Sequence, residues 1–232
     1  MLESNILVLG SKPESKLPDI HVDKIYTANG AAARAVEFRK KHNKNELICV
    51  VAAREFARNS YVSARIIESK PERILVTPGA IELPLQLKDY TKLVCISDQE
   101  QWNFQAKFFE NKKISLLIAE IFHQKNLNSK IIHFLKHLKN KNIQGVSRGF
   151  YSILLALEEN PNSNIIISGI GMRGGKQFYE SKRSEFFIYD SRARVDRYLV
   201  NKLLHFYKNR LYSLDTDLIE ISKIKKWQGN SF

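Results

Sequence analysis

Short apolar runs recur along the chain, separated by glycine, proline and polar residues. The first, residues 5–9 (NILVL), stops at Gly10, and residues 165–168 (IIIS) stop at Gly169. Runs of this length predict strands that are buried on both faces of a sheet. The predicted strands are residues 5–9, 24–28, 47–51, 73–77, 93–96, 165–168 and 211–214.

Longer segments between these runs have the pattern of amphipathic helices. In the clearest one, Ile153, Leu154 and Leu157 lie on one side of the predicted helix. Ser147 is a suitable N-cap, and Asn160 precedes a proline that ends the helix. The predicted helices are residues 30–41, 61–70, 98–110, 128–140, 147–160 and 192–207. Strands that alternate with helices indicate an α/β fold, with a mostly parallel, Rossmann-like sheet and helices on both faces.

The length and composition are those of one globular domain. The 232 residues, of which 44% are apolar, can bury a sizeable core, and we expect a single domain over residues 1–232. No run reaches the ~18 apolar residues of a membrane span, and the first residues lack the features of a signal peptide. We therefore expect a cytoplasmic protein. Cys49 and Cys95 each lie inside an apolar run, which favours buried thiols over a disulfide or a zinc site.

The charge favours an anionic partner without choosing one. Lysine and arginine outnumber aspartate and glutamate by 37 to 24, which gives a net charge of +13. Nucleic acid, nucleotide phosphates and an anionic membrane surface all fit this charge, and a solvated lysine-rich surface also explains it. The basic residues form no single tract and no nucleic-acid motif is present, which disfavours nucleic acid.

Three predicted turns carry the candidate chemistry. Gly10 suits close approach of backbone N–H groups to a phosphate, although an ordinary turn explains it as well. Asn29 suits a base or ribose edge through its amide, or simply a left-handed turn. Ser147, Arg148 and Gly149 place a hydroxyl, a guanidinium and a glycine at a helix start, which suits an anion site or a plain helix cap. All three turns lie at strand ends or helix starts, where one site at the carboxyl edge of the sheet would unite them.

These pieces resemble the bacterial sialyltransferases of glycosyltransferase family 42. That family has a strand followed by a G-x-G-P-S-like loop, here residues 8–15 (VLGSKPES) with Lys12 in place of one glycine. A strand ending in Cys-Asn or a similar pair comes next, here Ala28 and Asn29. A Thr/Ser-Ser-Gly-x-Tyr helix start, an apolar helix and a strand ending in Ser-Gly-Ile follow, here SRGFY, ILLALEEN and IIISGI.

The resemblance implies a glycosyltransferase that moves an acidic, sialic-acid-like sugar from a CMP-activated donor to a cell-surface glycan or glycolipid acceptor. The reaction would be inverting and would need no metal ion, with the CMP-sugar as co-substrate. Such an enzyme would act on a glycan precursor at the inner face of the membrane, where its basic charge would help it to sit near anionic lipid. The donor nucleotide would lie across Gly10, Ser11, Asn29, Ser147, Arg148 and Gly149. Tyr179 falls near a family tyrosine that assists departure of the phosphate.

The chain departs from the family at the general base. The family's histidine comes shortly before the closing helix, whereas this chain has no histidine between His137 and His205. Asp190 is the nearest candidate, because a carboxylate within hydrogen-bond reach of the acceptor hydroxyl can activate it. A loop or cap aspartate is the alternative interpretation.

Two arginines and one segment complete the predicted site. Arg173 and Arg192 could pair with a phosphate or with the carboxylate of the sugar, although Arg192 could equally be a solvated residue at a helix start. We expect residues 171–195 to form an active-site loop or lid.

Two other functions stay open at this stage. A basic nucleic-acid-binding protein would lose affinity steeply as salt rises. A non-sialyl relative, such as a pyrophosphokinase-like enzyme, would bind a nucleoside triphosphate with magnesium, for which the sequence shows few clustered carboxylates.

Overall fold

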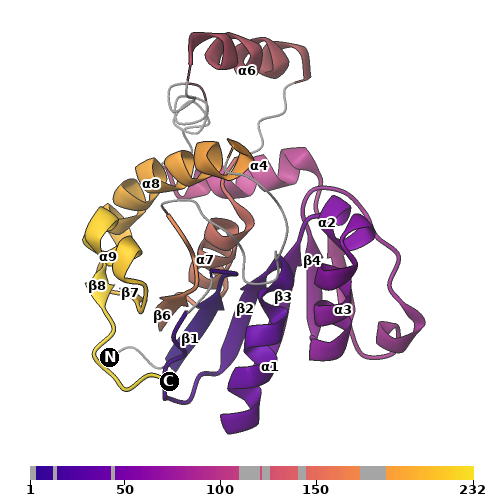
Figure 1. The fold of residues 1–232 in the computed structure, drawn as a ribbon, viewed down its shortest axis with the longest axis vertical. Helices are drawn as coiled ribbons and strands as arrows, with labels where there is room; N and C mark the ends of the chain where they lie inside the picture. The colour runs from indigo at the N-terminus through magenta and orange to yellow at the C-terminus, as the bar shows by residue number, and fades with distance from the viewer. Residues whose placement is uncertain are drawn as a thin grey trace.

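The centre of the protein is a sheet in which every described strand pair runs parallel (Figure 1). The computed structural model describes residues 4–12, 15–42, 45–109, 121, 126–140, 145–172 and 187–232. Within these residues the strand order is β5-β4-β3-β2-β1-β6-β7-β8. The strands are β1 (Ser4–Leu9), β2 (Lys24–Ala28), β3 (Glu46–Val51), β4 (Arg73–Val76), β5 (Lys92–Cys95), β6 (Ser163–Ser168), β7 (Leu211–Ser213) and β8 (Lys225–Lys226).

Helices cover both faces of the sheet, which confirms the predicted α/β fold. The described α-helices are α1 (Ala32–Lys41), α2 (Ala53–Arg58), α3 (Ser60–Ser69), α4 (Asp98–Lys107), α6 (Leu127–Asn140), α7 (Arg148–Glu159), α8 (Phe187–Tyr207) and α9 (Thr216–Ser222). Two short 3-10 helices, η1 (Asn29–Ala31) and η2 (Leu85–Leu87), lie in loops. The sequence pattern did not predict α2, α9 or β8, which are short, and it placed the start of α8 five residues late.

The core consists of two apolar layers, one on each face of the sheet. Ile6 and Val8 of β1 pack in a cluster with α7 and α8, whereas Leu7 and Leu9 pack in a second cluster with α1 and α3. These side chains are almost completely buried, because consecutive strand residues point to opposite faces and both faces are covered. The short apolar runs of the sequence therefore reflect burial on two sides.

The two cysteines differ in burial, and the prediction for one of them was wrong. Cys49 lies in the central strand β3, and burial raises the pKa of its thiol to about 11. Cys95 is exposed because β5 is the edge strand of the sheet and is the least covered of the longer strands. An apolar run in the sequence does not distinguish a central strand from an edge strand.

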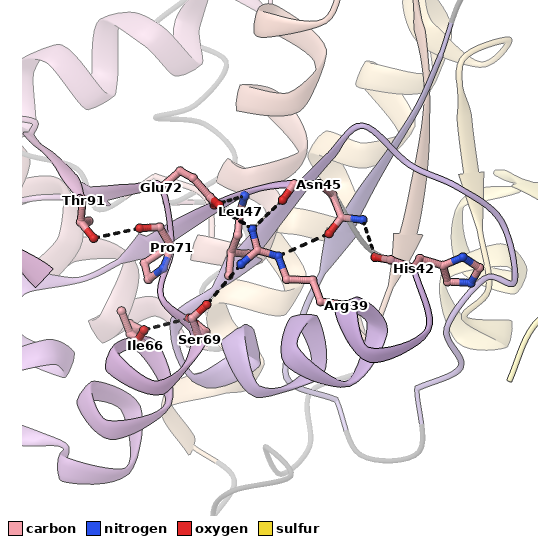
Figure 2. A network of polar contacts seen from close by, with 9 residues as sticks. All are labelled: Arg39, His42, Asn45, Leu47, Ile66, Ser69, Pro71, Glu72 and Thr91. Atoms are coloured by element: carbon pink, nitrogen blue, oxygen red, sulfur yellow. Dashed lines mark hydrogen bonds and ion pairs between the residues drawn. The ribbon is translucent and has the colours of Figure 1, made fainter. Parts of the chain in front are cut away.

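Polar side chains tie helices to strands at the amino edge of the sheet. Figure 2 shows Arg39, near the end of α1, between the start of β3 and the turn before β4. Its guanidinium donates to the backbone oxygens of Asn45 and Ser69 and to both carboxylate oxygens of Glu72, at 2.8 Å. Glu72 also accepts from the Leu47 backbone N–H at 2.6 Å. This network holds the amino ends of β3 and β4 against α1.

The order of the strands reverses between β1 and β6. From β1 the chain adds β2 to β5 on one side, then returns to add β6 to β8 on the other side of β1. In open parallel sheets a ligand binds at the carboxyl edge, where the strand order reverses. This rule therefore predicts a binding site at the carboxyl ends of β1 and β6.

Candidate functional site

Two glycines face each other where β1 and β6 end. Gly10 donates its backbone N–H to the Ser168 carbonyl oxygen at 2.8 Å, and Lys12 donates to the Gly169 carbonyl oxygen at 2.9 Å. A Cβ added to Gly10 would lie 2.1 Å from the Gly169 oxygen, and one added to Gly169 would lie 2.5 Å from the Gly10 oxygen. Gly169 also has a φ of +75°, which favours glycine. A side chain at either position would clash with the backbone of the other turn, and this contact is sufficient reason for glycine at both positions.

The turn after β2 lies beside the turn after β1. The Ser11 hydroxyl donates to the Ala28 carbonyl oxygen at 3.3 Å. Asn29, the next residue, is half-buried, and its side-chain oxygen accepts from the Ala52 backbone N–H at 3.4 Å, which connects the ends of β2 and β3. Asn29 has a φ of +50°, so the left-handed turn expected as one explanation of this asparagine is present. Its amide also lies at the carboxyl edge, which is where contact with the base or ribose of a nucleotide would require it.

The third predicted turn is the start of α7. Ser147 is the N-cap, and its hydroxyl accepts from the Phe150 N–H at 3.2 Å. The Ser147 N–H donates to the Asp196 carboxylate of α8 at 3.0 Å. The Arg148 side chain is buried, and its guanidinium lies 3.5 Å from the Gln101 side-chain oxygen in α4. The positive end of the helix dipole, with a serine and two buried charged side chains, therefore lies at this corner.

Contacts bring the three turns together. An added Cβ on Gly10 would lie 2.8 Å from the Ile170 side chain, and one on Gly149 would lie 3.4 Å from the same side chain. Ile170 thus touches both the turn after β1 and the first turn of α7, while Ser11 touches the end of β2. Residues far apart in the sequence meet at the carboxyl edge, where the strand order reverses.

A carboxylate that the sequence pattern did not single out also lies at this edge. Asp215 follows β7, is almost completely buried, and accepts from the Gly169 N–H at 2.9 Å and the Ile170 N–H at 3.0 Å. Burial raises the pKa of Asp215 to about 6, although the two backbone N–H groups oppose this shift. Asp215 thus positions the turn at Gly169 and Ile170, and Ile170 in turn contacts Gly10 and Gly149. The available signal was an acidic residue directly after the predicted strand 211–214.

A lysine beside this turn is also held by an acidic residue. The Lys12 ammonium lies 2.6 Å from an Asp217 carboxylate oxygen, with the lysine side chain about one third exposed. This ion pair connects the loop after β1 to the first turn of α9. Asp215 and Asp217, which both follow β7, therefore hold the turn after β6 and the loop after β1.

Four predicted site residues receive no side-chain description. Arg173 and Tyr179 lie outside the described residues. Asp190 and Arg192 lie in α8, but their side chains are outside the described part of the structure. Of the predicted lid over residues 171–195, residues 173–186 lie outside the described part, and the remainder that follows belongs to α8. The roles of these residues stay predictions.

The described residues were also considered as metal ligands and as membrane-spanning segments, and they suit neither. No group of three or more His, Cys, Asp or Glu side chains in this part of the chain could hold a metal ion. No helix within the described ranges is long and apolar enough to cross a membrane.

The fold resembles that of solved sialyltransferases. No protein-family model matches the chain, and no curated protein matches its sequence. The structure of the sialyltransferase CstII from Campylobacter jejuni in complex with the substrate analogue CMP-3FNeuAc has a TM-score of 0.50 at 13% sequence identity. That match covers 98% of this chain and 87% of the other. A structure of CST-II with a trisaccharide acceptor and CMP matches at 14% identity and a TM-score of 0.50, over 98% and 88% of the two chains. At these identities the likeness shows a shared fold.

Proposed function

We propose that this protein is an inverting glycosyltransferase that transfers an acidic, sialic-acid-like sugar from a CMP-activated donor to a glycan acceptor. One observation carries the proposal: the turns at Gly10, Asn29 and Ser147 meet at the carboxyl edge, where the strand order reverses. The solved proteins that share the fold over nearly the whole chain are described with CMP, a CMP-sugar analogue and a glycan acceptor.

The start of α7 suits the phosphate of the donor. The start of α7 is the positive end of the helix dipole, which favours an anion, although the Ser147 N–H already donates to Asp196 and the Phe150 N–H to the Ser147 hydroxyl. Gly149 lacks a side chain and is half-buried, and the Ile170 side chain lies beside it. The Arg148 side chain is buried at this turn, and so is the Asp196 carboxylate that accepts from the Ser147 N–H. In the proposal, Arg148 acts through the field of its charge more than by direct pairing.

The turn after β2 suits the nucleoside. The Asn29 side-chain oxygen already accepts from the Ala52 N–H, which leaves the two amide N–H groups as donors for a cytosine or ribose oxygen. The Ser11 hydroxyl donates to Ala28, so its lone pairs are the part that a ligand could use. These two side chains would orient the nucleotide, while the glycines admit it close to the backbone.

The transfer itself follows from the donor. The acceptor hydroxyl attacks the anomeric carbon of the sugar and loses its proton to a base, while the bond from that carbon to the phosphate oxygen breaks and CMP leaves with the electron pair. In this proposal Asp190 takes the proton and Tyr179 donates a hydrogen bond to the departing phosphate, as their positions in the sequence imply. Arg173 or Arg192 would pair with the sugar carboxylate.

Calorimetry with CMP tests the nucleotide site. Asn29→Gly removes the amide while it preserves the positive φ, so CMP affinity should fall at least about tenfold with no loss of the turn. Lys70→Gly is the matched control, since Lys70 also has a positive φ of 46° but ends α3 at the amino edge. Its CMP affinity should equal that of the wild type. No CMP binding by the wild-type protein would end the proposal.

Turnover tests the reaction. With CMP-sialic acid and related CMP-sugars, the protein should release CMP at the same rate in EDTA and in magnesium. Asp190→Asn should lower the transfer rate by about 100-fold or more without loss of CMP affinity, the usual scale of general-base catalysis. A rate that depends on magnesium, or an unchanged rate in Asp190→Asn, would contradict the corresponding part of the mechanism.

A further inference from the structure

Helix α6 exposes an apolar face. Ile131 and Leu135 are one helical turn apart, and about half of each side chain is exposed. Leu127, one turn earlier, is 69% exposed. Ten large apolar side chains in the described residues are exposed, and α6 supplies five of them, namely Leu127, Ile131, Ile132, Phe134 and Leu135. Single exposed apolar residues are ordinary, but a contiguous set on one helix marks an interaction surface.

The helix has its own start signal and a basic sequence. The Asn126 side-chain oxygen accepts from the Ser129 N–H at 2.8 Å, which is the contact of a helix N-cap. Residues 121–157 contain no aspartate or glutamate. The basic residues in and beside α6 are Lys125, Lys130, Lys136, Lys139 and Lys141, whereas Arg148 is buried in α7. A partner for α6 must therefore offer both apolar surface and negative charge.

We propose that α6 lies in the surface of an anionic lipid bilayer and docks the protein there. An amphipathic helix with lysines and large apolar residues buries its apolar face at the boundary of headgroups and acyl chains, and its charge is attracted by anionic lipids. The absence of acidic residues over residues 121–157 and the net charge of +13 fit this surface better than a neutral protein face. This proposal goes beyond the transferase function and does not depend on it.

The position of α6 would hold the candidate site near the bilayer. Figure 1 places α6 beyond α4 and α8, at one end of the molecule. Residues 141–146 connect the end of α6 to Ser147, the cap of α7. Because an extended residue spans at most about 3.6 Å, Ser147 lies within roughly 25 Å of Asn140. A docked α6 therefore keeps the start of α7 close to the membrane surface, where a lipid-linked acceptor would be present.

Vesicle flotation of the full-length chain tests the proposal. The protein should float with vesicles of phosphatidylcholine and phosphatidylglycerol at least about tenfold more strongly than with phosphatidylcholine alone. The double variant Ile131→Gln and Leu135→Gln keeps residues that favour a helix but removes part of the apolar face, and should lose about tenfold in partitioning. The matched control, Tyr61→Gln with Leu85→Gln, replaces two exposed apolar side chains outside α6 and should float like the wild type.

The outcomes are distinguishable. Lys136→Gln with Lys139→Gln keeps the apolar residues and should weaken binding to anionic vesicles several-fold, with circular dichroism confirming that each variant is folded. If the variant Ile131→Gln with Leu135→Gln does not fold, this lysine variant tests the proposal instead. Wild-type protein that does not float, or an α6 variant that floats like the wild type, would overturn the proposal. The proposal would also be overturned if the wild type is a dimer and Ile131→Gln with Leu135→Gln makes it a monomer, since a second copy would then cover α6. CMP affinity without lipid should be unchanged in every α6 variant, so failure here leaves the proposed function untouched.

Discussion

The two edges of the sheet use polar residues in different ways. At the amino edge, charged side chains pair with each other: Arg39 binds Glu72, and Arg73 binds Glu159, which also accepts from the Tyr26 hydroxyl at 2.6 Å. At the carboxyl edge where the strand order reverses, Lys12 also pairs with Asp217, but backbone groups make more of the contacts. There two glycines touch, and one carboxylate, Asp215, accepts two N–H groups. At the amino edge, therefore, the charged side chains bind mainly to other groups of the protein.

The difference separates a stabilising network from a candidate binding site. At the amino edge the Arg39 guanidinium and the Glu72 carboxylate bind each other and nearby backbone groups, so little of either is left for a ligand. At the carboxyl edge, glycines, a serine and an asparagine occupy turns that larger residues would fill. Side chains at one edge thus contribute stability, while the other edge places backbone and small polar groups side by side.

The largest expected effect is at the contact of the two glycines. Gly10→Ala would place a Cβ 2.1 Å from the Gly169 backbone oxygen, so the strand ends must separate. We expect a loss of about 3 kcal/mol in the free energy of unfolding, measured by urea denaturation, the upper range for overpacking. Gly149→Ala is the control: its Cβ meets only the Ile170 side chain at 3.4 Å, and stability should change by less than about 1 kcal/mol. Equal stabilities of the two variants would contradict the structure here.

The next effect should separate stability from binding. Arg39→Ala removes the donor that Asn45, Ser69 and Glu72 share, and should lower the free energy of unfolding by about 2 kcal/mol. CMP affinity, measured by calorimetry on the folded variant, should stay within about twofold of the wild type. Arg58→Ala, an exposed position, should change stability by less than about 0.5 kcal/mol. A large loss of CMP affinity in Arg39→Ala would show that the two edges are coupled.

The pH dependence of stability gives a third test, at Asp215. Its pKa is raised to about 6 in the folded state from an ordinary value of 3.8, so folding favours the protonated form. The associated stability is present below about pH 4 and is lost as the pH rises through 6. The stability advantage of the wild type over Asp215→Asn should therefore shrink between pH 4 and 6.5, by about 1–2 kcal/mol. Chemical denaturation across this range would show it, and a difference that is constant or grows with pH would refute it.

The smallest effect is expected at Lys12. Its ammonium pairs with Asp217 and is partly exposed, so Lys12→Gln should cost less than about 1 kcal/mol in the free energy of unfolding. CMP affinity should change by less than about threefold, because Asp217 holds the charge of this lysine. A tenfold loss of CMP affinity would instead indicate that Lys12 binds the phosphate directly and belongs to the nucleotide site.

Several features of the site could be predicted from the sequence because they are local. The apolar run before Gly10 and the serine cap at Ser147 follow from burial and from helix-cap chemistry within a few residues. The exposure of Cys95 could not be predicted, because an edge strand and a central strand have similar local patterns. Asp196 and Asp215 were missed because their partners are backbone N–H groups more than forty residues away.

By itself the sequence determined that strands alternate with helices, where most of them lie, and which turns contain small polar residues, since these depend on neighbours along the chain. Only the tertiary structure decided that β6 lies beside β1, that Gly169 touches Gly10, and that Asp215 reaches both Gly169 and Ile170. The physical reason is that strand order and side-chain contact across the sheet are set by the packing of the whole core, which no local pattern contains.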